Sequence, residues 1–371
     1  MRRELEQADR MLLIRLRSLG DSILTLPLLD ALHTWRPVLG LDVLIETHFA
    51  PVFRHHPAVR EVLTMRSRQA PGVPGWSKSE AARGIRRRRY PVVLNLHGGT
   101  TSLFLSLASG AGRRIGQRGF RASWCYNAHI PHSSGVWGRA KIHTIEHQLT
   151  LARWLRIPIT DAARPNLFVA EDARRDVGVR LSESGIRPNG YVLIQPTATL
   201  FTKQWPEHRF AELADRLADR FSLPVLFSAG SRESAVLERI RSQACRRHLY
   251  WSDLPLQALF ALIEGCRLFV GNDSGPTHAA AALRRPLVVV WGSSDYDVWR
   301  PWGTDNEIVR SALPCMPCPG YSCEEHGDPR CILDIGADAV LEACERMMSR
   351  SAAASGGNNS TSSGSIPPCA L

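Results

Sequence analysis

Residues 268–283 read LFVGNDSGPTHAAAAL, and this stretch decides how the second half of the chain folds. The apolar run 268–270 predicts a strand, the alanine-rich run from Ala279 predicts a helix, and the apolar run 287–291 predicts another strand. Strand, turn, helix and strand in this order form the repeating unit of a parallel α/β sheet. The turn 271–278 is therefore expected at the carboxyl end of a parallel strand, where such sheets bind ligands.

The turn itself has two interpretations. Gly271 and Gly275 let backbone N–H groups approach a ligand, and a helix that begins near Ser274 would point its positive end at an anion. This interpretation predicts a site for a phosphorylated ligand. In the other, Asp273 or Ser274 is an ordinary N-cap in a tight βα turn. The spacing alone fits both, so other parts of the chain have to decide.

The composition is that of a folded globular protein. The chain has 371 residues, of which 44% are hydrophobic and 22% are charged. Because this length exceeds one hydrophobic core, two domains are expected. Residues 1–6 are rich in charge, and no window supplies about 18 uncharged apolar residues. We therefore expect neither a signal peptide nor a membrane span, a cytoplasmic location, and nine mostly reduced cysteines.

Positive charge is concentrated in the first half. Residues 1–185 hold 28 Lys and Arg against 15 Asp and Glu, whereas residues 186–371 hold 18 against 20. Arg83 and the run Arg86–Arg89 form one basic group, and Arg113, Arg114, Arg118 and Arg121 follow. These residues are either a solvated basic face or a surface for a phosphorylated substrate, an anionic membrane or nucleic acid. No aromatic interleaving or recognised module supports the last, so no nucleic-acid partner is expected.

Strand-like and helix-like runs alternate, which predicts parallel sheets covered by helices. The first cycle has expected strands at 11–16, 42–46 and 92–96, and expected helices at 23–35, 102–108 and 145–155. After the breaker cluster RPNG at 187–190, strands are expected at 191–195 and 224–228, and helices at 206–220, 232–245 and 337–348. The expected domains are 1–186 and 187–348. The tail 349–371, rich in Ser, Gly, Ala and Asn, is expected to be disordered.

Candidate chemistry begins after the first strand. Neither G-x-G-x-x-G nor a P-loop follows it, so a standard dinucleotide site and a P-loop NTPase are not supported. Instead the strand leads into RLRSLGD at 15–21. In a ligand crevice, Asp21 could accept a proton from an attacking hydroxyl group. The alternative is that Asp21 only caps the next helix.

Two further strand ends carry polar residues. The stretch QPTATLFTKQWP at 195–206 combines hydroxyl groups with Lys203, the single lysine of the second half, beside an expected helix start. These groups suit a phosphate, although an ordinary surface lysine fits as well. Glu233 follows another strand end and could accept hydrogen bonds from ribose hydroxyls. It could equally be an acidic residue in the first turn of a helix.

Two cysteine and histidine patterns raise the question of metal. Cys315, Cys318, Cys323 and Cys331 have a spacing suited to a structural zinc site, and free thiols or an occasional disulfide are the alternatives. His143 to His147 reads HTIEH, which matches the H-x-x-E-H pattern of one class of zinc peptidases. The match is short and no third ligand follows, so the peptidase interpretation is set aside.

Taken together, several motifs resemble a known family. They are IRLRSLGD at 14–21, NLHGG at 95–99, TKQWP at 202–206, GNDSGPTH at 271–278 and WRPWG at 299–303. In this order they resemble glycosyltransferase family 9, the ADP-heptose:lipopolysaccharide heptosyltransferases. The resemblance covers about residues 11–348. It implies the GT-B type of α/β fold, in which two Rossmann-like doubly wound domains face a central cleft.

The resemblance also implies roles. Asp21 would be the general base of an inverting transfer, and Lys203 would hold the diphosphate. The donor side would further include Thr197, Glu233, Asp273, Ser274, Gly275 and His278, and the acceptor side Arg15, Ser18 and His97. No metal or other cofactor is then required for catalysis.

The resemblance implies a nucleotide-sugar donor, ADP-heptose, and an anionic lipid-linked saccharide acceptor. The basic first half would suit that acceptor and peripheral contact with the anionic face of the inner membrane. Asn95 stands where many relatives carry an acid, which bears on the identity of the acceptor. A non-catalytic protein that binds a sugar nucleotide or polyanion on the same fold is the alternative.

Overall fold

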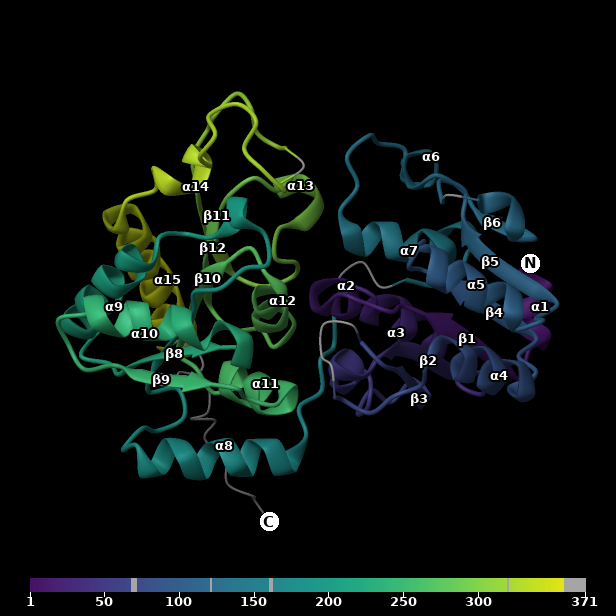
Figure 1. Cartoon of the computed structure of the whole chain (residues 1–371), viewed down its shortest axis with the longest axis horizontal. Coiled ribbons are helices and arrows are strands. Elements are labelled where there is room, and N and C mark those ends of the chain that lie inside the picture. Colours follow the sequence, from purple (N-terminus) through teal and green to yellow (C-terminus); the bar gives the residue numbers. More distant parts are fainter. Residues whose placement is uncertain (68–71, 121, 160–162, 319, 357–371) are drawn as a thin grey trace, which may run out of the picture.

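The computed structural model describes residues 1–67, 72–120, 122–159, 163–318 and 320–356. Two parallel sheets form the centres of two α/β domains, which lie side by side in Figure 1. The N-terminal sheet has the order β3-β2-β1-β4-β5-β6 and the C-terminal sheet the order β12-β11-β10-β7-β8-β9. Helices cover both faces of each sheet, as expected where the central strands are almost wholly buried. This is the predicted GT-B architecture.

The N-terminal domain follows the βα alternation expected from the sequence. Its strands are β1 (Arg10–Ile14), β2 (Gly40–Glu46), β3 (Val59–Met65), β4 (Val92–Asn95), β5 (Arg113–Gln117) and β6 (Ala128–Ile130). Its helices are α1 (Arg2–Gln7), α2 (Leu19–Ile23), α3 (Leu26–Trp35), α4 (Lys78–Arg88), α5 (Thr100–Ala108), α6 (Ser133–Trp137) and α7 (Thr144–Trp154), with 3-10 turns η1 (Thr47–Val52) and η2 (Ser123–Cys125). The single helix predicted at 23–35 is in fact two, with Pro27 in the first turn of α3.

The C-terminal domain repeats the pattern. Its strands are β7 (Val192–Gln195), β8 (Val225–Ala229), β9 (Leu249–Ser252), β10 (Leu268–Asn272), β11 (Leu287–Trp291) and β12 (Asn306–Arg310). Its helices are α8 (Glu171–Glu183), α9 (Glu207–Phe221), α10 (Ser234–Gln243), α11 (Leu256–Glu264), α12 (Gly275–Ala282), α13 (Tyr296–Trp299), α14 (Arg330–Leu333) and α15 (Ala337–Gly356), with 3-10 turns η3 (Phe201–Lys203) and η4 (Ser231–Glu233).

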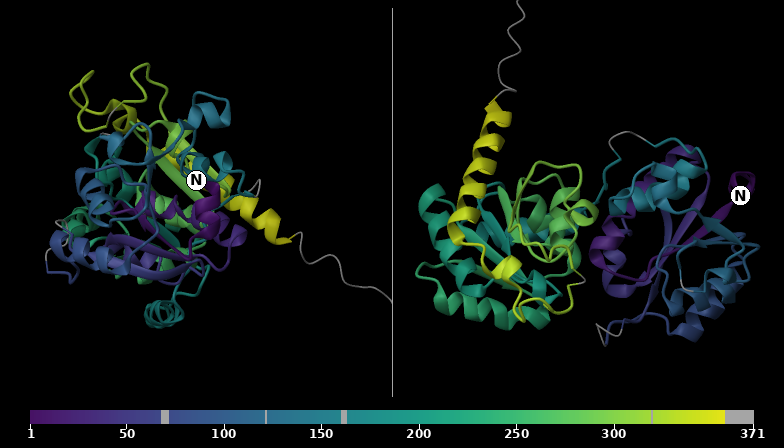
Figure 2. Two further views of the ribbon diagram at one scale, coloured as in Figure 1. Left: turned by 90° about the vertical axis from the view of Figure 1, so that its right-hand side faces the viewer. Right: turned by 90° about the horizontal axis from the view of Figure 1, so that it is seen from above.

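Two boundaries differ from those expected. Helix α8 precedes the expected boundary at 186/187, yet it packs against α11, and its Arg174 pairs with Glu264 at 2.6 Å. We therefore propose that the C-terminal domain includes α8, which lies beneath that domain in Figure 1. At the other end, α15 continues to Gly356, so the tail expected to be disordered from 349 is helical over its first eight residues. Figure 2 shows this helix projecting from the domain. Residues 357–371 lie outside the described residues.

In both domains, the polar turns lie where the strand order of the sheet reverses. In the N-terminal sheet the order reverses between β1 and β4, whose ends are in register at Ile14 and Asn95. In the C-terminal sheet it reverses between β7 and β10, with Gln195 opposite Gly271. Crevices at such reversal points are where open α/β sheets bind ligands. The turns that carry Asp21 and Asp273 therefore both lie at binding positions of their sheets.

The two domains meet through short helices that follow these strands. Helix α2 contacts α12, and one apolar cluster continues across both domains, with β1 on one side and β10 on the other. The contact is close because it is made through glycines. A Cβ atom at Gly275 would stand 2.8 Å from the Cβ of Leu19, and one at Gly20 would stand 2.9 Å from the Cδ2 of His278. Glycine at both positions thus brings the two strand-end turns together.

Candidate active site

Asp21 lies in the first turn of α2, where Ser18 is the N-cap residue in extended conformation. Its carboxylate accepts a hydrogen bond from Ser18 Oγ at 3.0 Å, and Arg15 Nη1 lies 3.5 Å from its other oxygen. The side chain of Asp21 is 28% exposed, so it remains accessible to a ligand. Three of the predicted residues, Arg15, Ser18 and Asp21, are thus brought together. The predicted alternative, a cap at Asp21, does not hold, since Ser18 occupies the cap position.

Arg15 is an unusual neighbour because it is almost wholly buried. It is 5% exposed, and its Nε has no hydrogen-bond partner among the described residues. Burial lowers the pKa of its guanidinium, and the charge of Asp21 opposes that shift. The pair thus places a buried cation beside the carboxylate that is the candidate general base.

His97 follows β4 and completes the N-terminal side of the site. Its backbone N–H donates to Asn95 Oδ1 at 2.9 Å, while Asn95 Nδ2 donates to Tyr126 Oη at 2.7 Å. Burial, together with the positive charges of Arg15 and Arg17, lowers the pKa of His97 to about 4. His97 is therefore a neutral imidazole at neutral pH, close to Arg15 and Asp21.

On the C-terminal side, Lys203 and Asp273 form an ion pair. Lys203 Nζ lies 2.7 Å from Asp273 Oδ2, and Ser294 Oγ donates to the same oxygen at 2.5 Å. The carboxylate is 4% exposed and the lysine 19%. The loop that carries Lys203 is held in place by Asn272, which accepts from the Trp205 backbone N–H and donates to the Pro196 carbonyl. Residues 70 positions apart in the sequence thereby form one charged centre.

The turn of residues 271–278 has the geometry of an anion-binding helix start. Ser274 is the N-cap of α12 in extended conformation, and its buried Oγ has no partner among the described residues. The first backbone N–H groups of α12, from Gly275 onward, precede any intrahelical partner. His278 lies in the same helix. Burial lowers its pKa, while Asp273 and Asp21 act in the opposite direction. His278 therefore lies within electrostatic reach of the key carboxylates of both domains.

Thr197 and Glu233 form a second polar group after β7 and β8. Thr197 Oγ1 donates to Glu233 Oε2 at 2.9 Å, and the Gly230 backbone N–H donates to the same oxygen at 3.2 Å. Gln195 Nε2 donates to Thr197 Oγ1 at 3.2 Å, and Gln195 Oε1 accepts from Ser228 Oγ at 2.6 Å. Glu233 ends the 3-10 turn η4 and is the N-cap residue of α10, so it stands at a helix start as one interpretation expected. Its contact with ribose hydroxyls stays a prediction.

A cavity of about 470 Å³ opens beside the Lys203–Asp273 pair. It is lined by Leu200, Lys203, Ser293, Ser294, Asp295, Trp299, Pro317 and Cys318. A second cavity of about 320 Å³ shares Ser294, Asp295 and Pro317 with it and reaches Lys141 of the N-terminal domain. The predicted residues Asp21, Thr197 and Glu233 are not part of either lining. The cavities therefore extend the site toward the segment after β11, which the sequence did not single out apart from the WRPWG motif.

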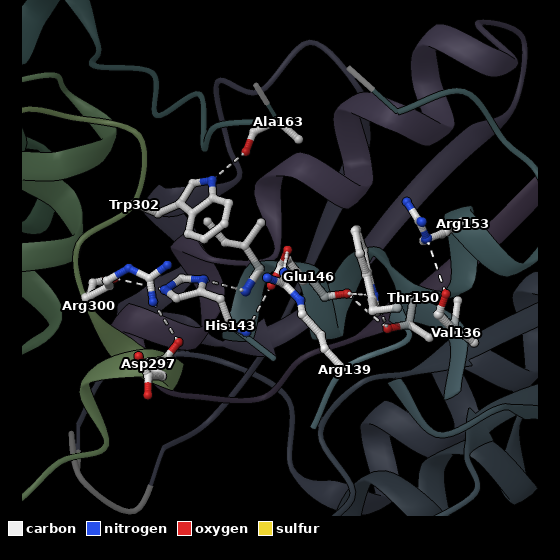
Figure 3. Close-up of polar contacts among 12 residues, drawn as sticks. Val136, Arg139, His143, Glu146, Thr150, Arg153, Ala163, Asp297, Arg300 and Trp302 are labelled. Carbon is white, nitrogen blue, oxygen red and sulfur yellow. Dashed lines mark hydrogen bonds and ion pairs between the residues drawn. The ribbon is translucent and has the colours of Figure 1, made fainter. Parts of the chain in front are cut away.

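Contacts between the domains border these cavities (Figure 3). His143 Nε2 bonds to the Arg300 carbonyl at 2.9 Å, and its ring stacks on Trp302 with centroids 4.3 Å apart. Thr144 Oγ1 donates to the Val298 carbonyl at 3.0 Å, and Lys141 Nζ lies 2.6 Å from Asp297. The segment 141–144, which leads into the first residue of α7, is thus joined to the segment 297–302 after β11.

The H-x-x-E-H histidines serve these contacts and the packing around them. His143 Nδ1 accepts from the Ile145 backbone N–H at 3.2 Å, and Glu146 pairs with Arg139 and closes a capping box at the start of α7 (Figure 3). His147 instead bonds to Ser133 at 2.5 Å and Gln117 at 2.8 Å. The two rings have different partners, so the peptidase interpretation fails.

The cysteine-rich segment forms a wall of the larger cavity. Cys318 lines it, its backbone N–H donates to the Ser293 carbonyl at 3.0 Å, and Thr202 Oγ1 donates to the Gly320 carbonyl. Within the described part of the chain, no three His, Cys, Asp or Glu side chains converge on a point where they could hold a metal ion. Burial, together with the nearby thiols of Cys315, Cys318 and Cys323, raises the pKa of Cys331. The structural zinc site expected at these four cysteines stays a prediction.

Comparison with known proteins identifies the family. The model of glycosyltransferase family 9 (heptosyltransferase) matches residues 79–327, more than half of the chain. The chain belongs to this family. It is 26% identical to lipopolysaccharide heptosyltransferase 3 of Escherichia coli K12 over 341 residues, which cover 90% of this chain and 96% of the relative. It is accordingly a glycosyltransferase.

Solved structures agree with this fold. A family 9 glycosyltransferase from Veillonella parvula matches with a TM-score of 0.78 at 19% identity, covering 92% of this chain and 98% of the other. The E. coli ADP-heptose LPS heptosyltransferase II matches with a TM-score of 0.74 at 23% identity, covering 92% and 99%. Among the described residues of this family 9 protein, no helix is long and apolar enough to cross a membrane.

Proposed function

We propose that this enzyme transfers a heptose, or a related sugar, from ADP-heptose to a lipid-linked acceptor of the lipopolysaccharide-core type. The observation that carries the proposal is the α2–α12 contact, because it brings Asp21 of one domain and the Lys203–Asp273 pair of the other within reach of His278. Glycosyl transfer requires a base that activates the acceptor hydroxyl and, across the cleft, a site that binds the phosphate of the donor. The similarity to lipopolysaccharide heptosyltransferase 3 and to the E. coli ADP-heptose LPS heptosyltransferase II supports the choice of donor and acceptor.

On the donor side, we assign the diphosphate to Lys203 and the first turn of α12. A lysine and free N–H groups at a helix start both favour negative charge. The buried Ser274 hydroxyl and Gly275 lie at that start, and neither presents a bulky side chain to the ligand. Glu233 and Thr197 form the polar pair that would accept hydrogen bonds from ribose hydroxyls. Asp273 and His278 would line the sugar side.

On the acceptor side, Asp21 acts as the general base. Its carboxylate takes the proton of the acceptor hydroxyl as that oxygen bonds to the anomeric carbon. The bond from that carbon to the diphosphate oxygen breaks with inversion, and ADP leaves with its charge stabilised by Lys203 and α12. Arg15 lies 3.5 Å from the carboxylate, Ser18 orients it through a hydrogen bond, and the neutral His97 can donate or accept a hydrogen bond at the acceptor.

The basic N-terminal half suits an anionic acceptor, and it supports a location at the cytoplasmic face of the inner membrane. Residues 1–185 carry 28 Lys and Arg against 15 Asp and Glu. A phosphorylated, lipid-linked saccharide and the membrane that holds it would both be attracted by this excess.

Calorimetry against a panel of ADP, UDP and GDP, followed by transfer assays with the matching nucleotide sugars, tests the proposal. We expect ADP to bind most tightly and ADP-heptose to be the donor that supports transfer. Preference for UDP or GDP would contradict the heptose assignment while leaving the family intact.

A further inference from the structure

Helices α4 and α5 form one layer on the N-terminal sheet. They contact each other and pack on the strands through a single apolar cluster that includes Ile85 of α4 and Leu105 of α5. The other helices with large apolar contacts, α3 and α7, pack together and belong to a different cluster. The outward sides of α4 and α5 therefore form a continuous surface that no other described helix covers, and we call it the α4–α5 face.

The α4 part of this face is basic. Arg83, Arg86, Arg87 and Arg89 are exposed, and none of them lies within 4 Å of a carboxylate among the described residues. Arg88 differs, because it pairs with Glu61 at 2.6 Å and lies over the Trp76 ring. Arg83, Arg86, Arg87 and Arg89 have no such structural contact among the described residues, so they are available to an anionic partner.

The α5 part of the face is apolar. Phe104 is 49% exposed and Leu107 is 44% exposed, one helical turn apart, with the partly exposed Leu103 beside them. Two polar residues of this helix, Ser102 and Ser106, are buried, while Thr100 and Thr101 in its first turn are at least partly exposed. Beyond that first turn the exposed side of α5 is apolar, whereas a surface helix normally exposes polar residues. Adjacent exposed apolar side chains of this kind mark an interaction surface.

The basic and apolar parts are continuous. The guanidinium of Arg86 packs against Gly110, which lies two residues past α5. A Cβ atom at position 110 would stand only 1.3 Å from Nη1 of Arg86. Arg86 therefore lies little more than one helical turn beyond Leu107.

The face also leads to the active site. Helix α5 begins at Thr100, three residues after His97, so its exposed side runs from the cleft toward Arg86. A flat partner that covered this face would end at the acceptor side of Asp21. This geometry suits a partner that carries the acceptor itself.

We propose that the α4–α5 face binds an anionic lipid bilayer, with the arginines at the headgroups and Phe104 and Leu107 in the interfacial layer. This inference rests on the proposed function, because it gives the lipid-linked acceptor a route to the cleft. Arginine charge attracts anionic lipid, and aromatic and aliphatic side chains add apolar burial at the interface. Nucleic acid would use the arginines but would give the aliphatic Leu103 and Leu107 no comparable partner.

Vesicle flotation of the full chain tests the proposal. We expect binding to phosphatidylcholine vesicles that contain phosphatidylglycerol and little binding to phosphatidylcholine alone. The triple variant Arg83→Glu, Arg86→Glu and Arg87→Glu should lose at least about tenfold in vesicle affinity. The variant Phe104→Ser with Leu107→Ser should lose several-fold and should also lose the part of binding that persists in high salt.

Matched changes on the other domain provide controls. Arg175, Arg187 and Arg247 are exposed and lack an ion pair among the described residues, and Val179 is 55% exposed on α8. Reversing these three charges, or replacing Val179 by Ser, should leave vesicle binding unchanged. Circular dichroism and ADP calorimetry check that every variant is folded, since no substituted residue belongs to the donor site.

Three outcomes would overturn the proposal. They are failure of the wild type to bind either vesicle, equal loss in the control variants, and salt-sensitive binding of RNA by the same arginines without any effect of Phe104 and Leu107. Failure of the proposed function would be separate, because it would appear as absent transfer to a detergent-solubilised acceptor while vesicle binding persisted.

Discussion

Lys203 forms an ion pair with Asp273 and is also the residue to which we assign the donor diphosphate. It pairs with Asp273 at 2.7 Å, and Ser294 donates a hydrogen bond to the same carboxylate. We propose that Lys203 bridges Asp273 and the leaving phosphate when the donor is bound. Because the charge on that phosphate grows as the sugar departs, a lysine in this position would contribute most in the transition state.

Replacing Lys203 by Ala should lower kcat about 100-fold or more, because one preorganised cation is lost from the leaving group. ADP binding should weaken as well. Steady-state kinetics with saturating donor and calorimetry with ADP measure the two effects separately. An alanine variant with normal kcat would show that Lys203 is not at the phosphate.

His143 makes the stability of the folded chain depend on pH. Its Nδ1 accepts from the Ile145 N–H, and its Nε2–H donates to the Arg300 carbonyl. Neither ring nitrogen is therefore free to take up a second proton. Burial accordingly lowers its pKa to about 4 from the ordinary 6.5. Between these values the unfolded chain binds the proton and the folded chain does not, so stability rises with pH through this window and falls on acidification.

At pH 5 this residue alone should cost the wild type about 2 kcal/mol relative to neutral pH. The variant His143→Asn keeps a side chain that can cap α7 but does not titrate, so it should lose less stability between pH 7 and pH 5. Urea denaturation at both pH values measures the difference. Equal losses in the two proteins would show that His143 titrates normally.

At the scale of elements, the contact between α2 and α12 is the feature on which the cleft depends. A methyl group at Gly275 would stand 2.8 Å from the Cβ of Leu19, which cannot move away without shifting α2. We expect Gly275→Ala to cost about 1–3 kcal/mol of stability, as overpacking usually does. It should also reduce transfer more than ADP binding, because it displaces Asp21 relative to the donor site.

Gly178 in α8 is the matched control, since a Cβ there would meet no atom within 4 Å. Gly178→Ala should raise stability by about 0.5–1 kcal/mol through helix propensity, with unchanged activity. If both alanine variants behaved alike in thermal melts and transfer assays, close packing at α2–α12 would not be the cause.

The elements also show how far the sequence could be interpreted. The turn 271–278 was predictable because an apolar strand, two glycines and an alanine-rich helix follow one another locally. Helix α8 was missed, although Ala173, Val177 and Leu181 repeat every four residues and are buried together. Its place beneath the second domain depends on contacts with α11, about 90 residues away along the chain, such as Arg174 with Glu264.

The same limit applies to the site. Asp21, Lys203 and Asp273 follow strand ends, so local patterns could find them. Ser294 and Lys141 could not be found in this way, because Ser294 bonds to Asp273, which lies 21 positions earlier, and Lys141 bonds to Asp297, which lies 156 positions later. Such partners follow from strand order and domain packing rather than from any short motif.

At the scale of the whole molecule, we propose that the two domains divide the reaction between them. The base and the basic acceptor surface are assigned to the first domain, and the phosphate and ribose sites to the second. On this proposal ADP binding does not depend on Asp21, whereas transfer needs Asp21 directly.

Comparing Asp21→Asn with the wild type, in ADP calorimetry and in transfer from ADP-heptose to a lipid-linked acceptor, tests this division most directly. The substitution keeps the shape of the side chain and removes its basicity. We predict that ADP affinity changes by less than about threefold while transfer falls by about 100-fold or more. Transfer that persisted in Asp21→Asn, or ADP binding that was lost with it, would contradict the account.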